Sequence, residues 1–229
     1  MATGRADDVA TRVMATSLFV FDLDGTLVDS RRDIADSANV VLASCGLTPH
    51  PDEAIGGMVG DGAAMLIARA FAAAGQPAPP DALDRFLVAY DSRLLRFTRP
   101  YDGIPRLLEV LATRGTLAVL TNKPIGATRT ILDGLGLAAH FGDRVLGGDG
   151  PHARKPDPGG MRQLIAAAGV QPAQTMMIGD SIVDLRTAHV AGTRACVTRY
   201  GFGFHNFPLS ELTATDVIVD SPLELLTHL

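Results

Sequence analysis

The stretch Ser17-Leu-Phe-Val-Phe-Asp-Leu-Asp-Gly-Thr-Leu-Val-Asp-Ser30 decides the fold of this chain. Its first part, residues 17–22, is an almost continuous apolar run, which is typical of a short strand buried on both faces of a parallel sheet. Asp22, Asp24 and a Gly-Thr pair follow, so polar side chains begin where the strand ends. Open α/β sheets bind ligands outside the carboxyl ends of their strands. The stretch therefore predicts both a parallel sheet and a functional site at its edge.

Apolar runs and helical patterns alternate from about residue 101 to the end of the chain. This alternation is typical of a doubly wound α/β fold with a Rossmann-like parallel sheet. The expected helices end near glycine, and two of them begin with proline. We expect strands at Thr116–Thr121, Thr175–Gly179 and Arg194–Thr198, and helices at Gly103–Arg114, Pro124–Leu135 and Pro158–Ala168.

Residues 31–99 interrupt this alternation, because they contain no convincing strand. Apolar residues recur there at helical spacing in Ile34–Leu42, Ala63–Ala74 and Leu83–Leu95, with prolines between these segments. We therefore expect a small helical domain inserted into the sheet domain. The predicted organisation is a flexible leader at 1–16, an α/β core formed by 17–30 and 100–229, and a helical cap at 31–99.

The composition of the 229 residues excludes several classes of protein. The net charge of −5 argues against a surface that binds nucleic acid or an anionic membrane. No segment approaches the roughly 20 apolar residues that span a bilayer. Cys45 and Cys196 stand far apart and in no metal-binding pattern, so we expect a protein of the reducing cytoplasm. Lysine is scarce, since only Lys123 and Lys155 occur among the 20 basic residues.

Four polar clusters stand where the predicted strands end. Together they hold several carboxylates, which suit a hard divalent cation, and a hydroxyl and a lysine, which suit phosphate oxygens. The clusters are Asp22–Asp29, Thr121–Lys123, Lys155–Pro158 and Gly179–Asp184.

In this order the four clusters resemble the signature motifs of the haloacid dehalogenase superfamily, in its phosphatase branch. The segment 31–99 lies where that superfamily inserts a helical type-1 cap. Further stretches, among them Val59-Gly60-Asp61-Gly62-Ala63 and Thr121-Asn122-Lys123-Pro124, resemble the phosphoglycolate phosphatase family within it. The resemblance implies a hydrolase that acts on a small phosphorylated metabolite, with 2-phosphoglycolate as the expected substrate. The sequence carries no signal for an oligomeric state.

The resemblance also implies a role for each motif residue. Asp22 is the expected nucleophile, which takes the phosphoryl group as an aspartyl-phosphate, and Asp24 is the expected general acid and base. Thr121 and main-chain N–H groups near Asn122 are expected to hold phosphate oxygens. Lys155 is expected to offset charge on the phosphoryl group and on Asp22.

A Mg²⁺ ion is the expected cofactor. In the family its protein ligands are matched here by Asp22, the main-chain carbonyl of Asp24, and Asp180. Asp184 follows Asp180 by one helical turn, and we expect it behind these ligands, facing the water shell of the ion. Asp61 and Arg69 of the cap are candidates for contacts to the leaving group of the substrate.

Simpler interpretations exist for several of these residues. Asp22 and Asp24 could be turn formers, Asp180 could cap a helix, and Asp61 could do the same in the cap. For Lys123 a solvated position beside Pro124 is the favoured interpretation.

Other functions remain open at this point. An inorganic pyrophosphatase or a β-phosphoglucomutase-like enzyme of the same superfamily uses the same core residues. A non-catalytic module that binds a phosphorylated ligand belongs to another class, and it would be expected to lack one of Asp22, Asp24, Lys155 or Asp180. Asp24 argues against a dehalogenase, and the absence of lysine from 31–99 argues against a Schiff-base hydrolase.

Overall fold

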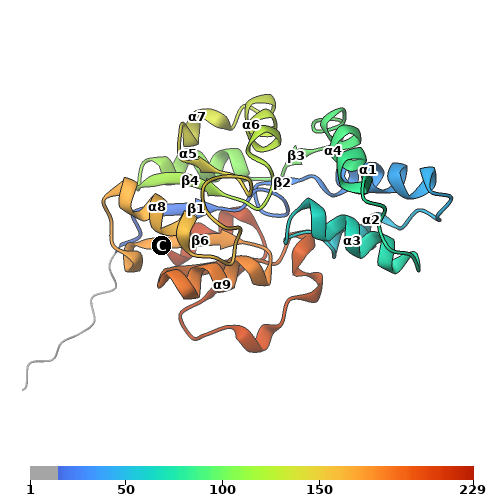
Figure 1. Cartoon of the computed structure of the whole chain (residues 1–229). Coiled ribbons are helices and arrows are strands. Elements are labelled where there is room, and N and C mark those ends of the chain that lie inside the picture. The colour runs from blue at the N-terminus through green and yellow to red at the C-terminus, as the bar shows by residue number, and fades with distance from the viewer. Residues whose placement is uncertain (1–14) are drawn as a thin grey trace, which may run out of the picture.

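A parallel sheet of six strands forms the centre of the larger part of the molecule in the computed structural model, which describes residues 15–229 (Figure 1). The spatial order is β5-β4-β1-β6-β7-β8, and all neighbouring pairs run parallel. This confirms the predicted doubly wound α/β class. The predicted leader lies outside the described residues except for its last two. The strands are β1 (Leu18–Phe21), β4 (Thr116–Leu120), β5 (Val145–Leu146), β6 (Thr175–Gly179), β7 (Arg194–Thr198) and β8 (Val217–Val219).

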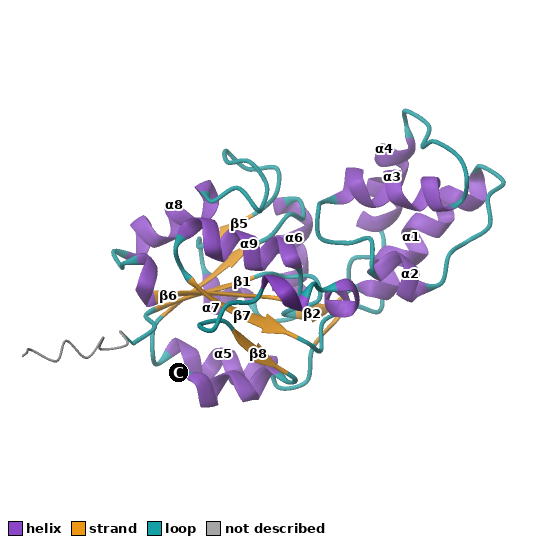
Figure 2. Cartoon of the chain, turned by 90° about the horizontal axis from the view of Figure 1, so that it is seen from below, coloured by secondary structure: helices purple, strands orange, loops and turns teal. Residues whose placement is uncertain are grey.

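Helices cover both faces of the sheet, and the alternation of side chains along β1 shows why. Phe19 and Phe21 point to one face, in a core shared with α5, α6 and α7, whereas Leu18 and Val20 point to the other, in a core shared with α8 and α9. All four side chains are buried, and burying each contributes about 2 kcal/mol. Figure 2 shows α5 and α8 on opposite sides of the sheet. These helices are α5 (Ile104–Ala112), α6 (Ile125–Gly134), α7 (Ala138–Phe141), α8 (Gly159–Ala168) and α9 (Ile182–Ala191).

Four further helices form a separate helical lobe, residues 31–98, which projects from one end of the sheet (Figures 1 and 2). A short antiparallel ribbon, β2 (Val28–Asp29) with β3 (Arg99–Pro100), joins its two connections to the core. Buried Asp33 also fastens the exit of the lobe, because its Oδ2 accepts hydrogen bonds at 2.8 Å from the N–H groups of Phe97 and Thr98. The lobe helices are α1 (Arg31–Ser44), α2 (Asp52–Gly56), α3 (Ala63–Ala73) and α4 (Ala82–Asp91).

The predicted elements differ from the observed ones mainly at their ends. β1 ends at Phe21 and β4 at Leu120, so Asp22 and Thr121 lie just beyond the strands. The short strands β5 and β8 were not expected, nor was the five-residue helix α2. Four 3₁₀ helices complete the described chain, at Pro172–Gln174, Phe202–Asn206, Leu209–Glu211 and Pro222–His228. No helix in residues 15–229 has the length and apolar character needed to cross a membrane.

Candidate active site

Asp22 and Asp24 lie in the loop that leaves the central strand β1. This strand has β4 on one side and β6 on the other. Strands that follow β1 in the chain therefore lie on both sides of it, and the strand order reverses at this point. The Asp22 N–H extends the sheet by donating to the Ile178 carbonyl at 2.9 Å, and the chain then folds back, with the Gly25 N–H 2.9 Å from the Val28 carbonyl. Both carboxylates are buried. They therefore occupy the switch point at which open α/β sheets bind ligands.

Two glycines leave room for the carboxylates of Asp180 and Asp184. Gly25 has a φ of 81°, and a Cβ built on it would lie 1.8 Å from a carboxylate oxygen of Asp180. A Cβ on Gly179 would lie 2.2 Å from Cγ of Asp184. A larger residue at either position would push a carboxylate out of the site.

Asp22, Asp180 and Asp184 form a buried acidic cluster, in which one carboxylate oxygen from each lies within 4.8 Å of the others. Burial raises the pKa of Asp22 to about 6, against the opposing effect of Lys155. Burial, together with Asp184 and Asp22, also raises the pKa of Asp180 well above its usual range. A divalent cation would offset this repulsion, and a set of carboxylate oxygens suits Mg²⁺. The residues present therefore fit the metal that the sequence predicts.

Lys155 lies between two of these carboxylates. Its Nζ is 2.9 Å from Oδ1 of Asp22 and 2.5 Å from Oδ1 of Asp184, and the side chain is buried. Burial acts to lower the pKa of Lys155, but Asp184 and Asp22 outweigh it and raise the pKa above its usual range. Oδ2 of Asp184 accepts from the N–H and the hydroxyl of Ser181, at 3.1 and 2.6 Å. Groups of the protein thus occupy both oxygens of Asp184.

Asn122 holds the backbone of Lys155 in place. Its Oδ1 accepts from the Lys155 N–H at 2.8 Å, and its Nδ2 donates to the Lys155 carbonyl at 3.0 Å. The same Nδ2 donates to the Gly60 carbonyl of the helical lobe at 2.8 Å. The Asn122 side chain therefore joins three segments, a role that the sequence did not suggest.

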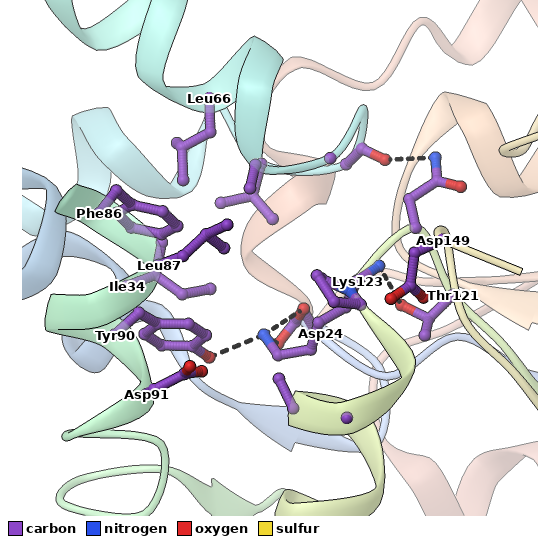
Figure 3. Close-up of a pocket in the computed structure, with 18 of the residues that line it drawn as sticks. Asp24, Ile34, Leu66, Phe86, Leu87, Tyr90, Asp91, Thr121, Lys123 and Asp149 are labelled. Atoms are coloured by element: carbon purple, nitrogen blue, oxygen red, sulfur yellow. Dashed lines mark hydrogen bonds and ion pairs between the residues drawn. The ribbon is translucent and has the colours of Figure 1, made fainter. Parts of the chain in front are cut away.

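Thr121 follows β4 and faces the same space as Asp24 (Figure 3). Its N–H donates to the Leu146 carbonyl at 3.0 Å, which ties it to the neighbouring strand β5. Its Oγ1 accepts from the Lys123 N–H at 3.3 Å. Among the hydrogen bonds of the described residues this hydroxyl donates none, so its proton is free for an oxygen of a ligand.

Lys123 is buried, and the expectation that it is solvated was wrong. Only 8% of it is exposed, and its Nζ lies 3.0 and 2.9 Å from the two carboxylate oxygens of Asp24. Ser30 donates to the same carboxylate. Nζ also donates to the hydroxyl of Tyr90 at 2.7 Å. The scarcity of lysine was the one signal that could have identified this position, since both lysines of the chain pair with the aspartates that follow β1.

A cavity of about 270 Å³ lies between the strand ends and the helical lobe. Figure 3 shows its two walls: polar groups from the strand ends and an apolar surface from the lobe. The sequence did not identify Tyr90 as a site residue, because it reads as a core position of an amphipathic helix. The polar wall includes Asp22, Asp24, Thr121, Asn122 and Lys123, and the lobe contributes Ile34, Leu66, Phe86, Leu87 and Tyr90.

Asp61 and Arg69 are paired with each other and do not line this cavity. Arg69 also donates to the Met58 carbonyl at 3.0 Å, so the pair fastens the loop before α3 to that helix. The structure thus brings together the predicted core residues but not these two residues of the lobe.

Comparison with known proteins identifies the family to which this chain belongs. A family model for haloacid dehalogenase-like hydrolases matches residues 16–192. A phosphoglycolate phosphatase of Rhodospirillum rubrum is 43% identical over 210 residues, which cover 88% of this chain and 86% of the relative. One of Caulobacter vibrioides is 36% identical, with 90% and 87% covered. The crystal structure of a predicted phosphoglycolate phosphatase from Haemophilus somnus matches with a TM-score of 0.84 and 31% identity, covering 93% of this chain and 97% of that one. The chain belongs to the haloacid dehalogenase-like hydrolase family.

Proposed function

We propose that this protein is a Mg²⁺-dependent phosphatase that hydrolyses a small phosphate monoester, with 2-phosphoglycolate as the substrate. The observation that carries the proposal is the convergence of Asp22, Asp24, Thr121 and Lys155 at the strand ends beside the cavity. The relatives named phosphoglycolate phosphatase, which match most of the chain, support the choice of substrate. Residues 31–99 are proposed to act as the cap over this site.

The reaction proceeds in two displacements. A carboxylate oxygen of Asp22 attacks phosphorus, the bond from phosphorus to the ester oxygen breaks, and Asp24 gives a proton to the leaving alkoxide. Asp24 then takes a proton from a water molecule, whose oxygen attacks the phosphorus and releases inorganic phosphate. Asp22 is returned as a carboxylate, so both aspartates end the cycle as they began it.

Charge around the phosphoryl group is offset by this chain and by the metal. Lys155 favours the ionised form of Asp22 and stands beside the transferred group, and the free proton of Thr121 binds one oxygen of that group. When bound by Asp22, Asp180 and the main-chain carbonyl of Asp24, Mg²⁺ supplies positive charge that lets the substrate dianion approach these carboxylates. Asp184 keeps Lys155 in position.

The lining of the cavity favours a monoester with a small leaving group over the related reactions. A pyrophosphate or a bisphosphorylated sugar would place a second phosphate in this cavity. Its lining includes an apolar surface and the carboxylates of Asp91 and Asp149. Among the described residues that line the cavity, Lys123 is the one basic residue. A second dianion is poorly matched to that balance of charge. A module that only binds its ligand has no need of the paired carboxylates Asp22 and Asp24.

We also propose that the protein works in the cytoplasm. Cys45 and Cys196 are free thiols, and Cys196 is buried. Unpaired cysteines are usual in proteins of a reducing compartment.

The Asp22→Asn variant tests the proposed function. Its turnover of 2-phosphoglycolate with Mg²⁺ should fall at least about a thousandfold, because an amide cannot act as the nucleophile. Thermal unfolding should show that the variant is folded. Wild-type protein should rank 2-phosphoglycolate above β-glucose 1-phosphate and pyrophosphate by kcat/KM. Retained turnover in the variant would contradict the nucleophile, and a flat ranking would contradict the substrate.

A further inference from the structure

Tyr90 on α4 reaches from the helical lobe into the cavity. It is 4% exposed, and its ring stacks on Phe86 with centroids 5.6 Å apart and an interplanar angle of 10°. Leu87 and Ile34 lie nearby in the same apolar wall (Figure 3). The ring is therefore held by packing, while its hydroxyl points toward Lys123 and the strand ends.

The Tyr90 hydroxyl has a proton to donate. Its oxygen accepts a hydrogen bond from Nζ of Lys123 at 2.7 Å, and an ammonium group can only donate. Among the hydrogen bonds of residues 15–229, this hydroxyl donates to no acceptor. Burial raises the pKa of Tyr90 above its usual range, so the hydroxyl keeps its proton at neutral pH. A buried donor without an acceptor is costly, which makes it a ready partner for a ligand oxygen.

The positive charge in the cavity lies next to the Tyr90 hydroxyl. Lys123 is the one basic residue among the described residues that line it, and its other contacts are the two oxygens of Asp24. Asp24 is the residue proposed to give its proton to the leaving alkoxide. A free donor and an ammonium thus lie together beside the expected position of the leaving group.

We propose that Tyr90 and Lys123 together bind the acidic group of the leaving alcohol, a carboxylate bonded to the ester carbon. This inference rests on the proposed phosphatase function and adds the group that recognises the alcohol. The carboxylate accepts a hydrogen bond from the Tyr90 hydroxyl and lies beside the Lys123 ammonium, and charge-assisted bonds of this kind are among the strongest. Tyr90 is then a specificity-determining residue that the lobe supplies to a site built on the sheet.

The Tyr90→Phe variant tests this inference, because it keeps the ring stacked on Phe86 and removes only the hydroxyl. We compare kcat/KM for 2-phosphoglycolate with that for ethyl phosphate, in which a methyl group replaces the carboxylate. For 2-phosphoglycolate the variant should lose about tenfold to a hundredfold, the range for a hydrogen bond to a charged group. For ethyl phosphate the change should stay within about twofold. Tyr101→Phe is the matched control, since Tyr101 lies outside this cavity, and it should leave both values unchanged.

Failure of the inference and failure of the proposed substrate give different results. Wild-type protein without a preference for 2-phosphoglycolate over ethyl phosphate would contradict the substrate itself. A wild-type preference that Tyr90→Phe fully retains would overturn the role of Tyr90 alone. An equal loss for both esters would overturn it too, because Tyr90 would then act on the reaction through Lys123 and Asp24 and not on the carboxylate.

Discussion

Single residues explain how three carboxylates can be buried together in this protein. Asp22 and Asp184 share the ammonium of Lys155, and the Gly203 N–H donates to Asp180 at 2.7 Å. These contacts leave the pKa of Asp22 raised to about 6. Positive charge from the protein is therefore insufficient to offset the burial and mutual repulsion of the three carboxylates. A bound cation contributes most to stability in such a cluster.

Gly25→Ala should disable the metal site. Its Cβ would overlap a carboxylate oxygen of Asp180, and a φ of 81° is already unfavourable for alanine. We expect a loss of more than about 2 kcal/mol in the free energy of unfolding and a fall of at least about a hundredfold in activity. Denaturant unfolding measures the loss of stability, and the rate of turnover as Mg²⁺ is titrated measures the loss of activity.

Gly46→Ala is the matched control for this prediction. Gly46 has a φ of 74°, but nothing lies within 4 Å of a Cβ built on it. The substitution should therefore cost only the backbone strain, about 1 kcal/mol, and leave activity unchanged. Equal effects of the two substitutions on activity would contradict the close approach of Gly25 to Asp180.

At the scale of secondary-structure elements, the site depends on contacts between segments that are distant in sequence. The Asn122 side chain after β4 binds the Lys155 backbone and the Gly60 carbonyl of the helical lobe. Tyr90 on α4 contacts Lys123 beyond the same strand. The lobe thus touches the sheet on either side of the cavity, and the β2–β3 ribbon is its connection to the core.

Asn122→Ala should lower both stability and turnover. It leaves a buried N–H of Lys155 without its acceptor, which costs about 1–3 kcal/mol of unfolding free energy. It also frees the loop that aims Lys155 at Asp22, so kcat should fall at least about tenfold.

Asn39→Ala provides the comparison for Asn122→Ala. The Asn39 side chain donates to the carbonyl of His50 and accepts from its N–H, both at 2.8 Å, as Asn122 does with Lys155. Asn39 and His50 both lie within the lobe. Both residues are only partly buried, so we expect a smaller loss of stability, with kcat preserved. If both variants kept a normal kcat, the positioning of Lys155 by Asn122 would be disproved.

The sequence could predict elements with a strong periodic pattern and motifs at their ends. Asp22, Thr121, Lys155 and Asp180 were identifiable because each follows an apolar run or precedes a helix signal. β5 and β8 have two and three residues, which is too short for a period to be visible. Tyr90 and the burial of Lys123 depend on how the lobe packs against the sheet, and no local pattern reports such a contact.

At the scale of the whole molecule, the acidic cluster should make the stability of the metal-free protein depend on pH. The pKa of Asp22 is raised from 3.8 to about 6 and that of Asp180 is also raised, so the folded protein binds these protons more tightly than the unfolded chain. The resulting stabilisation is complete below about pH 4 and is lost as the pH rises through about 6. We predict a decrease of order 2 kcal/mol in unfolding free energy between about pH 5 and pH 7 without metal.

Mg²⁺ and the Asp180→Asn variant separate this effect from other titrations. Mg²⁺ should stabilise the wild-type protein more at about pH 8 than at about pH 5, where protons compete with the ion. Asp180→Asn should show a smaller dependence on pH without metal and little response to Mg²⁺. A metal-free wild type whose stability rises between about pH 5 and pH 7 would contradict the raised pKa values.

Covalent trapping of the phosphoryl group tests the central claim, that Asp22 is the nucleophile of a phosphatase. Enzyme mixed with 2-phosphoglycolate and Mg²⁺ is quenched with acid and treated with borohydride, which reduces an acyl phosphate to an alcohol, and the peptides are identified by mass spectrometry. We predict reduction at residue 22 in the wild type, and none at this residue in Asp22→Asn. Turnover of the substrate with no modified peptide, or with reduction at another carboxylate, would contradict the account.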